Sequence, residues 1–406
     1  MIHTEDDIKQ QLFQFKTELD NELDSILSFW CDYTVDTDNG GFYGSVDNDN
    51  TPDASAPKGI VLYSRILWAF SAAYNLKPVP GYLLMAKRAY ENILSFFVDK
   101  KYGGVYWSAD AAGNMLDGKK QIYGLSFCIY GLSEYYKVTN DEQAMETAIA
   151  LYHLIEDKSF DKDRNGYIEA FARDWSEIND LRLSEKDNNE RKTMNTHLHI
   201  VEAYANLFSV WPDDGLRERI ENLLWLFLRY FFNSNNRHYN LFFNDDWKQK
   251  SSLQSYGHDI EAAWLLQQCA EQIGNEEHME AFKCLAVTVT EAASEGLDKD
   301  GGLWYEFEPD GNRLIAEKHS WPQAEAMIGF YNAYQITGNE NYLRQSLHSW
   351  EFVKRFIKDN QNGEWFWGVN GDYSVMQKDK AGFWKCPYHN SRACLELISR
   401  IEKLIK

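Results

Sequence analysis

Several features that mark other classes of protein are missing from this sequence. The first residues, MIHTEDDIKQQ, are acidic and have no apolar core, so they do not resemble a secretory signal. The most apolar stretch, 223–232, is too short to cross a bilayer and contains Arg229. The six cysteines form no CxxC pair and no disulfide-framework spacing. We therefore expect a cytoplasmic protein with reduced thiols and no contact with membranes.

Motifs for cofactors and metals are also missing. No HExxH, Walker A or GxGxxG phosphate fingerprint occurs in a fitting strand–helix context. The segment DKDRNGYIEA resembles a calcium loop from Asp161, but its twelfth position is Ala172, where a bidentate carboxylate is needed. His197 and His199 are two residues apart, so on a helix they point to different faces and do not form a metal pair. We predict no metal and no cofactor.

Positive charge is scarce, because 41 Lys and Arg residues stand against 62 Asp and Glu residues, for a formal net charge of −21. Such a chain repels phosphate backbones, so we expect no nucleic-acid binding, and it disfavours strongly anionic substrates. A solubilising acidic surface would be enough to explain the charge. A Pro-, Gly- or Ser-rich linker is missing as well, so we predict one domain over residues 1–406.

What the chain does contain is a short sequence motif repeated six times, a Gly- or Asn-bearing turn followed by an alternating run of aromatic residues. The copies begin at Asn39 (NGGFYGSVD), Tyr102 (YGGVYWSAD), Asn165 (NGYIEAFARDW), Asn236 (NRHYNLFFNDDW), Asp300 (DGGLWYEFEPDG) and Asn362 (NGEWFWGVNGD). Each copy is typical of a short hairpin. Their separation, about 60 to 70 residues, leaves room for two helices per repeat.

Helical periodicity dominates between these copies. Six segments are apolar nearly all round, as helices buried on both sides would be: 61–74, 121–136, 194–208, 255–270, 321–335 and 387–401. Segments 80–97 and 341–357 are more amphipathic and suit an outer layer. The pattern predicts an all-α fold, an (α/α)6 barrel with short β-hairpins in the loops at one mouth.

Polar and aromatic residues gather near the start of each predicted inner helix. They are Arg65; Tyr123; Asn195, His197 and His199; His258 and Glu261; Trp321, Gln323 and Glu325; and Trp384 and His389. We expect Asn195 to be an N-cap, and Pro322 and Pro387 to lie in first helical turns, which places Trp321 and His389 at the mouth. A histidine at a helix start is often structural, but three at equivalent points of a ring indicate an active site.

Two histidines on opposite sides of a cavity suit a two-base proton exchange at carbon, in which one removes a proton and the other returns one. Near a helix N-terminus, histidine tends to stay neutral and can accept a proton. Arg65 could stabilise the oxyanion of an enediolate, or form a buried ion pair instead. Glu261 lies three residues after His258 and could orient it, or simply bond along the helix surface.

Five segments carry a resemblance to a known family: KGIVLYSRILWAF, MNTHLHIVEAY, SYGHDIEAAWLL, WPQAEAMIGFYNAY and WKCPYHNSRA. They resemble the cellobiose 2-epimerases of the N-acylglucosamine 2-epimerase superfamily, in order, with similar spacing and over essentially the whole chain. The family fold is an (α/α)6 barrel, as the repeat count predicts. In two places the chain departs from the pattern. Ser320 stands where some relatives have an aromatic residue, and 209–250 is too irregular to align.

The resemblance implies cofactor-free epimerisation at C2 of the reducing-end sugar of β-1,4-linked disaccharides, cellobiose and also lactose or mannobiose. It implies that His258 and His389 are the acid/base pair, while His199 and Arg65 assist ring opening and hold the cis-enediolate. The other implied roles are support of His258 and sugar contact by Glu261, hydroxyl binding by Tyr123 and Asn195, sugar stacking by Trp321 and Trp384, and binding of the non-reducing unit by Asp187 and Glu306. His197 stays structural, and we expect a monomer rather than a dimer.

Other functions stay open at this point. A glycoside hydrolase would need two carboxylates across the scissile bond, and Asp187, Glu261, Glu306 and Glu325 are candidates. Histidines and an arginine at the mouth favour proton transfer instead. An N-acylglucosamine 2-epimerase and an aldose–ketose isomerase share the enediolate chemistry. A non-catalytic sugar-binding module would not need three histidines.

Overall fold

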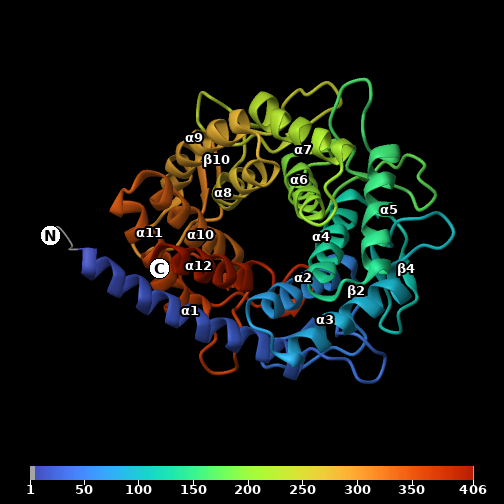
Figure 1. Cartoon of the computed structure of the whole chain (residues 1–406), viewed down its shortest axis with the longest axis horizontal. Helices are drawn as coiled ribbons and strands as arrows, with labels where there is room; N and C mark the ends of the chain where they lie inside the picture. Colours follow the sequence, from blue (N-terminus) through green and yellow to red (C-terminus); the bar gives the residue numbers. More distant parts are fainter. Residues whose placement is uncertain (1–4, 406) are drawn as a thin grey trace.

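The structure, a computed structural model, describes residues 5–405 and contains two concentric rings of helices (Figure 1). The inner ring consists of α2 (Ile60–Leu76), α4 (Ile122–Thr139), α6 (Met194–Phe208), α8 (Tyr256–Ile273), α10 (Ser320–Thr337) and α12 (His389–Ile405). The outer ring consists of α1 (Glu5–Tyr33), α3 (Pro80–Asn92), α5 (Glu142–Lys158), α7 (Asp214–Leu226), α9 (Glu276–Ala293) and α11 (Glu340–Phe352). The predicted (α/α)6 arrangement is confirmed.

Burial separates the two rings as the periodicity predicts. Helix α2 is buried at nearly every position of its first three turns, whereas α3 buries only Ala86, Ala89 and Tyr90. Each inner helix packs against its two inner neighbours and at least one outer helix, and α12 contacts both α2 and α1. The ring therefore closes on itself, with the first outer helix lying against the last inner one (Figure 1).

Short irregular helices end four of the outer helices. π-helical turns follow α3, α7 and α11 at Ile93–Phe97, Phe227–Phe231 and Val353–Ile357, and a 3₁₀ turn follows α9 at Ser294–Gly296. After each outer helix the chain makes a turn closed by one antiparallel bridge. The six bridges are Val35–Phe42, Val98–Val105, Phe160–Tyr167, Phe232–Tyr239, Leu297–Leu303 and Lys358–Trp365. They confirm the six repeated turns. Asp161 closes the third turn by accepting the backbone N–H groups of Asp163 and Arg164, so the calcium-like segment is a turn of the repeat.

Each aromatic run pairs with a strand of a neighbouring repeat, and two of the runs also form the predicted short hairpins. Antiparallel pairs join β2 (Lys58–Gly59) to β3 (Ser108–Ala109), β5 (Lys120–Gln121) to β6 (Ala170–Phe171), β7 (Lys192–Thr193) to β8 (Phe242–Phe243), β9 (Gln254–Ser255) to β10 (Glu306–Glu308), β12 (Lys318–His319) to β13 (Gly368–Val369), and β14 (Ala381–Gly382) to β1 (Ser45–Val46). Strands β4 (Met115–Asp117) and β11 (Arg313–Ile315) extend two of these sheets and form the two hairpins, β3 with β4 and β10 with β11. Each inner helix thus begins directly beside a neighbouring repeat, which fixes its start at the mouth.

In five of the six repeats, a buried lysine holds the turn to the strand that follows it. Each lies in or next to the strand before an inner helix and bonds to an aspartate of the preceding turn: Lys58–Asp36, Lys120–Asp99, Lys192–Asp161, Lys318–Asp298 and Lys380–Asp359, at 2.6–2.9 Å. The fourth repeat has Gln254 and Asn233 at these places. Removing one partner of such a buried pair typically costs about 3–5 kcal/mol, so the five pairs hold the loops at the mouth.

Two predicted helix starts differ in detail from the structure. Thr193, not Asn195, is the N-cap of α6, because the Thr193 side chain accepts the N–H of Thr196. Pro322 lies in the first turn of α10 as predicted, but Pro387 precedes α12, which begins at His389. None of the helices within residues 5–405 is long and apolar enough to cross a membrane.

Candidate active site

A pocket of about 170 Å³ lies where the inner helices begin, and it brings the predicted residues together. Ten of the eleven predicted site residues line it: Arg65, Tyr123, Asp187, Asn195, His199, His258, Glu261, Trp321, Trp384 and His389. The eleventh, Glu306, lines a second pocket of about 630 Å³. The two pockets share Lys186, Asp187, Asn195, His258, Tyr305 and other residues, so they form one cavity with an inner and an outer part.

The three predicted histidines line the inner pocket together with His319, and each of the three has its Nδ1 atom held by another side chain. Nδ1 of His389 lies 2.6 Å from Glu325 Oε1, Nδ1 of His199 lies 2.8 Å from Glu202 Oε2, and Nδ1 of His258 lies 2.7 Å from Ser255 Oγ. The Nε2 atoms have no hydrogen-bond partner among residues 5–405 and are left for a substrate. The three rings therefore present proton-transfer atoms to one space.

We expected the three histidines at equivalent points of the ring, but they lie at different depths along their helices. His389 is the first residue of α12, His258 the third of α8 and His199 the sixth of α6. Burial lowers the pKa of His258 to about 3, and burial lowers the pKa of His389 well below its ordinary value although the Glu261 carboxylate opposes this. Both rings are therefore neutral at pH 7 and can act as bases.

The predicted support of His258 by Glu261 is wrong within the described residues. Oε1 of Glu261 accepts Nη2 of Arg392 at 2.5 Å and lies 3.8 Å from Nδ1 of His389. His258 is held by Ser255 instead. Glu261 lines the pocket but belongs to the surroundings of His389, because both of its contacts, to Arg392 and His389, are to residues of α12.

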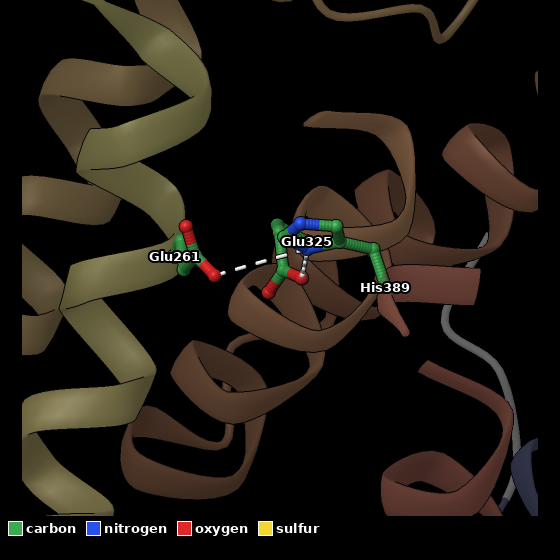
Figure 2. A group of neighbouring side chains, drawn as sticks. All are labelled: Glu261, Glu325 and His389. Carbon is green, nitrogen blue, oxygen red and sulfur yellow. Dashed lines mark hydrogen bonds and ion pairs between the residues drawn. The ribbon is translucent and has the colours of Figure 1, made fainter. Parts of the chain in front are cut away.

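Glu261, Glu325 and His389 converge closely enough to resemble a metal site (Figure 2). Figure 2 shows Glu261 reaching from one helix toward His389, with Glu325 beside the imidazole. Nη2 of Arg392 contacts the same oxygens, Glu261 Oε1 at 2.5 Å and Glu325 Oε1 at 2.7 Å. The positive charge at this place is thus the Arg392 guanidinium, and a metal ion could bind only by displacing it.

Arg65 is a buried cation that has no carboxylate within ion-pair distance in residues 5–405, so the ion-pair alternative is wrong. Its Nη2 donates to the Tyr123 hydroxyl at 2.8 Å, and its guanidinium lies 4.1 Å from the ring centre of Phe127 and 4.6 Å from that of Tyr388. Its Nε is buried without a hydrogen-bond partner. An unbalanced guanidinium at the pocket wall favours a substrate group that develops negative charge.

Aromatic rings form the walls of the inner pocket. The Trp321 ring packs against two histidines, 4.9 Å from the His258 ring centre and 5.5 Å from that of His389. Trp384 packs against Tyr123 at 6.0 Å, and also against Trp107 and Phe383. Such flat, partly apolar walls suit the apolar faces of sugar rings.

Acidic side chains line the outer pocket. Burial raises the pKa of Glu306 to about 7 and raises that of Glu169 to about 7 as well. Glu169 accepts the hydroxyls of Thr193 and Thr196, which ties it to the start of α6. Asp187 accepts the backbone N–H and the hydroxyl of Ser184, so its carboxylate is held at the boundary between the two pockets.

His197 has a structural role, whereas Asn195 belongs to the site. His197 is fully buried, its Nδ1 lies 2.7 Å from the Thr193 carbonyl oxygen, and its Nε2 accepts the N–H of Tyr167. It is structural, as predicted. Asn195 lines both pockets, and its Oδ1 is buried without a hydrogen-bond partner, which leaves it available to a hydroxyl group.

Several residues of the site were not predicted. The unpredicted supporting groups are Glu202, Ser255, Tyr388 and Arg392, and the unpredicted pocket walls include Lys186, Tyr305, His319, Trp365 and Cys386; Glu325 was expected near a helix start, but not as the partner of His389. Spacing could have revealed three of the supporting groups. Glu202 and Arg392 each follow a pocket histidine by three residues, and Glu325 follows Trp321 by four. A side chain at that spacing lies on the same helix face, one turn deeper.

Comparisons with known proteins agree with this site. A sequence profile of the N-acylglucosamine 2-epimerase (GlcNAc 2-epimerase) family matches residues 41–393, so the chain belongs to that family. It is 46% identical over 385 residues to the cellobiose 2-epimerase of Bacteroides fragilis, which covers 94% of this chain and 98% of the relative. Within the family the chain therefore belongs with the cellobiose 2-epimerases.

Solved structures support the same placement. The cellobiose 2-epimerase of Bacillus thermoamylovorans matches with 41% identity and a TM-score of 0.90, over 95% of this chain and 99% of that one. The enzyme of Spirochaeta thermophila matches with 37% identity and a TM-score of 0.92, over 98% of this chain and 99% of that one. The predicted family is confirmed.

Proposed function

We propose that the protein epimerises C2 of the reducing-end sugar of β-1,4-linked disaccharides, turning cellobiose into glucosyl-mannose. The observation that carries this proposal is a pair of neutral imidazoles, His258 and His389, that both pack against Trp321 in one pocket. Each has Nδ1 held and Nε2 left for the substrate. Two such groups can remove a proton from one face of a carbon atom and return one to the other face.

The steps follow from the groups in the pocket. After ring opening, one histidine takes the C2 proton, and the electron pair moves into the C1 carbonyl to form a cis-enediolate whose negative charge lies mainly on O1. Arg65, unpaired by any carboxylate in residues 5–405, stabilises that charge. The other histidine, which has first taken a proton from water, returns it as imidazolium to the opposite face of C2, and the first histidine then releases its proton to water. Glu325 at Nδ1 of His389 supports its protonated form.

The shape of the cavity favours a disaccharide. The reducing-end sugar would lie in the inner pocket between Trp321 and Trp384, with hydroxyls near Tyr123 and Asn195. The second sugar would extend into the outer pocket, where Asp187 and Glu306 accept its hydroxyl groups. The volume of the outer part, about 630 Å³, lies in the range of ordinary ligand pockets.

The carboxylates give less support to hydrolysis. A glycosidase needs two carboxyl groups that flank the scissile bond. Glu325 is fully buried beneath His389, and Glu261 is held by Arg392, so neither is free for that role. Glu306 lines only the outer pocket, and Asp187 is held by Ser184 at the boundary between the two pockets.

The test is proton NMR of cellobiose, mannobiose and lactose, each incubated with the enzyme and EDTA in D2O. The expected result is deuterium at C2 together with the C2-epimeric disaccharide. Release of free monosaccharides would instead establish hydrolysis. Deuterium at C1 with a ketose product would establish an aldose–ketose isomerase, and turnover of N-acylglucosamine alone would move the substrate to the other branch of the family. A monomeric state and a cytoplasmic location stay predictions.

A further inference from the structure

A buried carboxylate, Glu202, lies one helical turn behind His199 and outside the pocket wall. Its side chain is 3% exposed, and Oε2 accepts Nδ1 of His199 at 2.8 Å. Its other oxygen, Oε1, accepts Nη1 of Arg392 at 2.5 Å and the Tyr388 hydroxyl at 2.5 Å. Both oxygens are therefore occupied by donors, and the only pocket residue among those donors is His199.

Arg392 connects this carboxylate to a second histidine. Its Nη2 donates to Glu325 Oε1, the same oxygen that lies 2.6 Å from Nδ1 of His389. The chain of contacts His199–Glu202–Arg392–Glu325–His389 thus crosses the floor of the site. His258 stands outside this chain, because its partner is the uncharged hydroxyl of Ser255.

We propose that Glu202 is a positioning residue that keeps the proton of His199 on Nδ1, so that Nε2 presents a lone pair to the anomeric hydroxyl of the sugar. The involvement of His199 in ring opening rests on the proposed function. A carboxylate can only accept a hydrogen bond, so it selects this tautomer, whereas a hydroxyl such as that of Ser255 can donate or accept and selects neither.

The neighbours of Glu202 keep its carboxyl group ionised, so that it can only accept hydrogen bonds. Burial alone would raise the pKa of its carboxyl, but Arg392, His199 and Tyr388 together lower it to about 2. Arg392 itself is always protonated, so it donates at all accessible pH values. The accepting character of Glu202 toward His199 therefore does not change across the working range of the enzyme.

The proton balance of ring opening is simple with this tautomer. The O1–H proton passes to Nε2 of His199, the C1–O5 bond breaks with its electron pair on O5, and C1 becomes a carbonyl. The imidazolium, stabilised by the Glu202 carboxylate, then returns the proton to O5. No oxidant, reductant or other reactant is needed, and His199 ends in its starting state.

The substitution Glu202→Gln tests the tautomer directly. An amide has one oxygen, and Arg392 and Tyr388 donate to the side of Oε1, so the amide oxygen stays there. The NH2 group then faces Nδ1 of His199 and forces the proton onto Nε2. The pocket would then lose the hydrogen-bond acceptor at Nε2 of His199, while the size and shape of the substituted side chain stay nearly unchanged.

The experiment measures three quantities in the wild type, Glu202→Gln and Glu202→Asp. They are acceleration of cellobiose mutarotation, the rate of C2 epimerisation, and the nitrogen-15 shifts of the His199 ring, assigned by their loss in His199→Asn. We expect Glu202→Gln to lower both rates about 100-fold, to leave KM within about 3-fold, and to turn Nε2 from an unprotonated to a protonated nitrogen. Glu202→Asp should keep the wild-type tautomer and recover part of the rate.

The control is Glu156→Gln, which removes another carboxylate that accepts tyrosine hydroxyls, those of Tyr167 and Tyr204, away from the pocket. It should leave both rates and the His199 signals unchanged. A wild-type tautomer in Glu202→Gln would overturn the proposal, whatever the rates, because a rate loss without it reflects packing alone. If the wild-type enzyme acts on no disaccharide, the proposed function fails, while the nitrogen-15 comparison still decides the role of Glu202.

Discussion

Replacing Glu325 with glutamine should inactivate the enzyme without unfolding it. Oε1 of Glu325 accepts His389 Nδ1 at 2.6 Å and Arg392 Nη2 at 2.7 Å, and Oε2 accepts Trp264 Nε1 at 3.0 Å. All three partners donate, but an amide has a single oxygen. In either orientation of the new amide the NH2 group faces a donor, which leaves a buried group unpaired at a cost of about 1–3 kcal/mol in stability.

The effect on rate should be larger than the effect on stability. If the NH2 group faces His389, the ring takes the other tautomer and Nε2 can no longer accept the C2 proton. If the amide oxygen stays beneath His389, the negative charge that supports the imidazolium is still lost. A correctly placed acid or base contributes about 10²–10⁴ in rate, equal to about 2.7–5.4 kcal/mol of activation free energy. Because Glu325 does not line the pocket, KM should change by less than about 3-fold.

The assay compares kcat and KM for cellobiose epimerisation with the thermal unfolding temperature of the same preparation. Glu156→Gln is the matched control, since Glu156 accepts two tyrosine hydroxyls on the far side of the inner ring and touches no pocket residue. It should lose stability but keep its kcat. A folded Glu325→Gln variant with kcat within about 3-fold of wild type would refute the assignment of His389 as an acid/base group.

Three further predictions address other parts of the site. His258→Asn and His389→Asn should abolish deuterium exchange at C2 with the fold intact by circular dichroism, whereas His153→Asn on the outer ring should not; near-normal turnover would contradict the two-base mechanism. Trp384→Ala should lower kcat/KM for cellobiose about 10-fold through lost stacking, and an unchanged value would make Trp384 a packing residue. Burial raises the folded-state pKa of Glu169 from 4.5 to about 7, so this group stabilises the fold below pH 4.5 and loses that contribution as the pH rises through 7. The stability of Glu169→Gln relative to wild type should therefore increase by about 3 kcal/mol between pH 5 and pH 8 in urea unfolding; a difference independent of pH would show that Glu169 is ionised throughout.

Much of the fold could be predicted because the same local signals occur six times. Repeated turns and six helices that are apolar all round specify two rings whatever the details of any one repeat. The pairing of the aromatic runs could not be predicted, since strands of two residues carry no periodicity that identifies a partner. Caps were uncertain for a similar reason: Thr193 and Asn195 are both good capping residues, and only the backbone decides between them.

The pocket walls were predicted better than the groups behind them. All eleven predicted residues line the cavity, because helix starts in a ring must meet at its mouth. The partner of a histidine depends instead on how deep each helix lies relative to its neighbours. Glu261 has the right spacing to support His258, yet Arg392 from another helix takes it. Such contacts between helices leave no pattern in a single sequence.

The lysine–aspartate pairs described above also make the six sectors of the ring unequal. Five turns at the mouth are held to the following strand by a buried lysine–aspartate pair, whereas the fourth, which has Asn233 and Gln254 at these places, is held to α8 by the buried His238 and Asp259, 2.7 Å apart. That turn precedes the strand and helix that carry Ser255 and His258, and this strand pairs with the one that carries Glu306. The sector that carries His258 is therefore fixed through its inner helix rather than through the strand before it, because Asp259 of α8 accepts both His238 and the N–H of Tyr239 from the fourth turn.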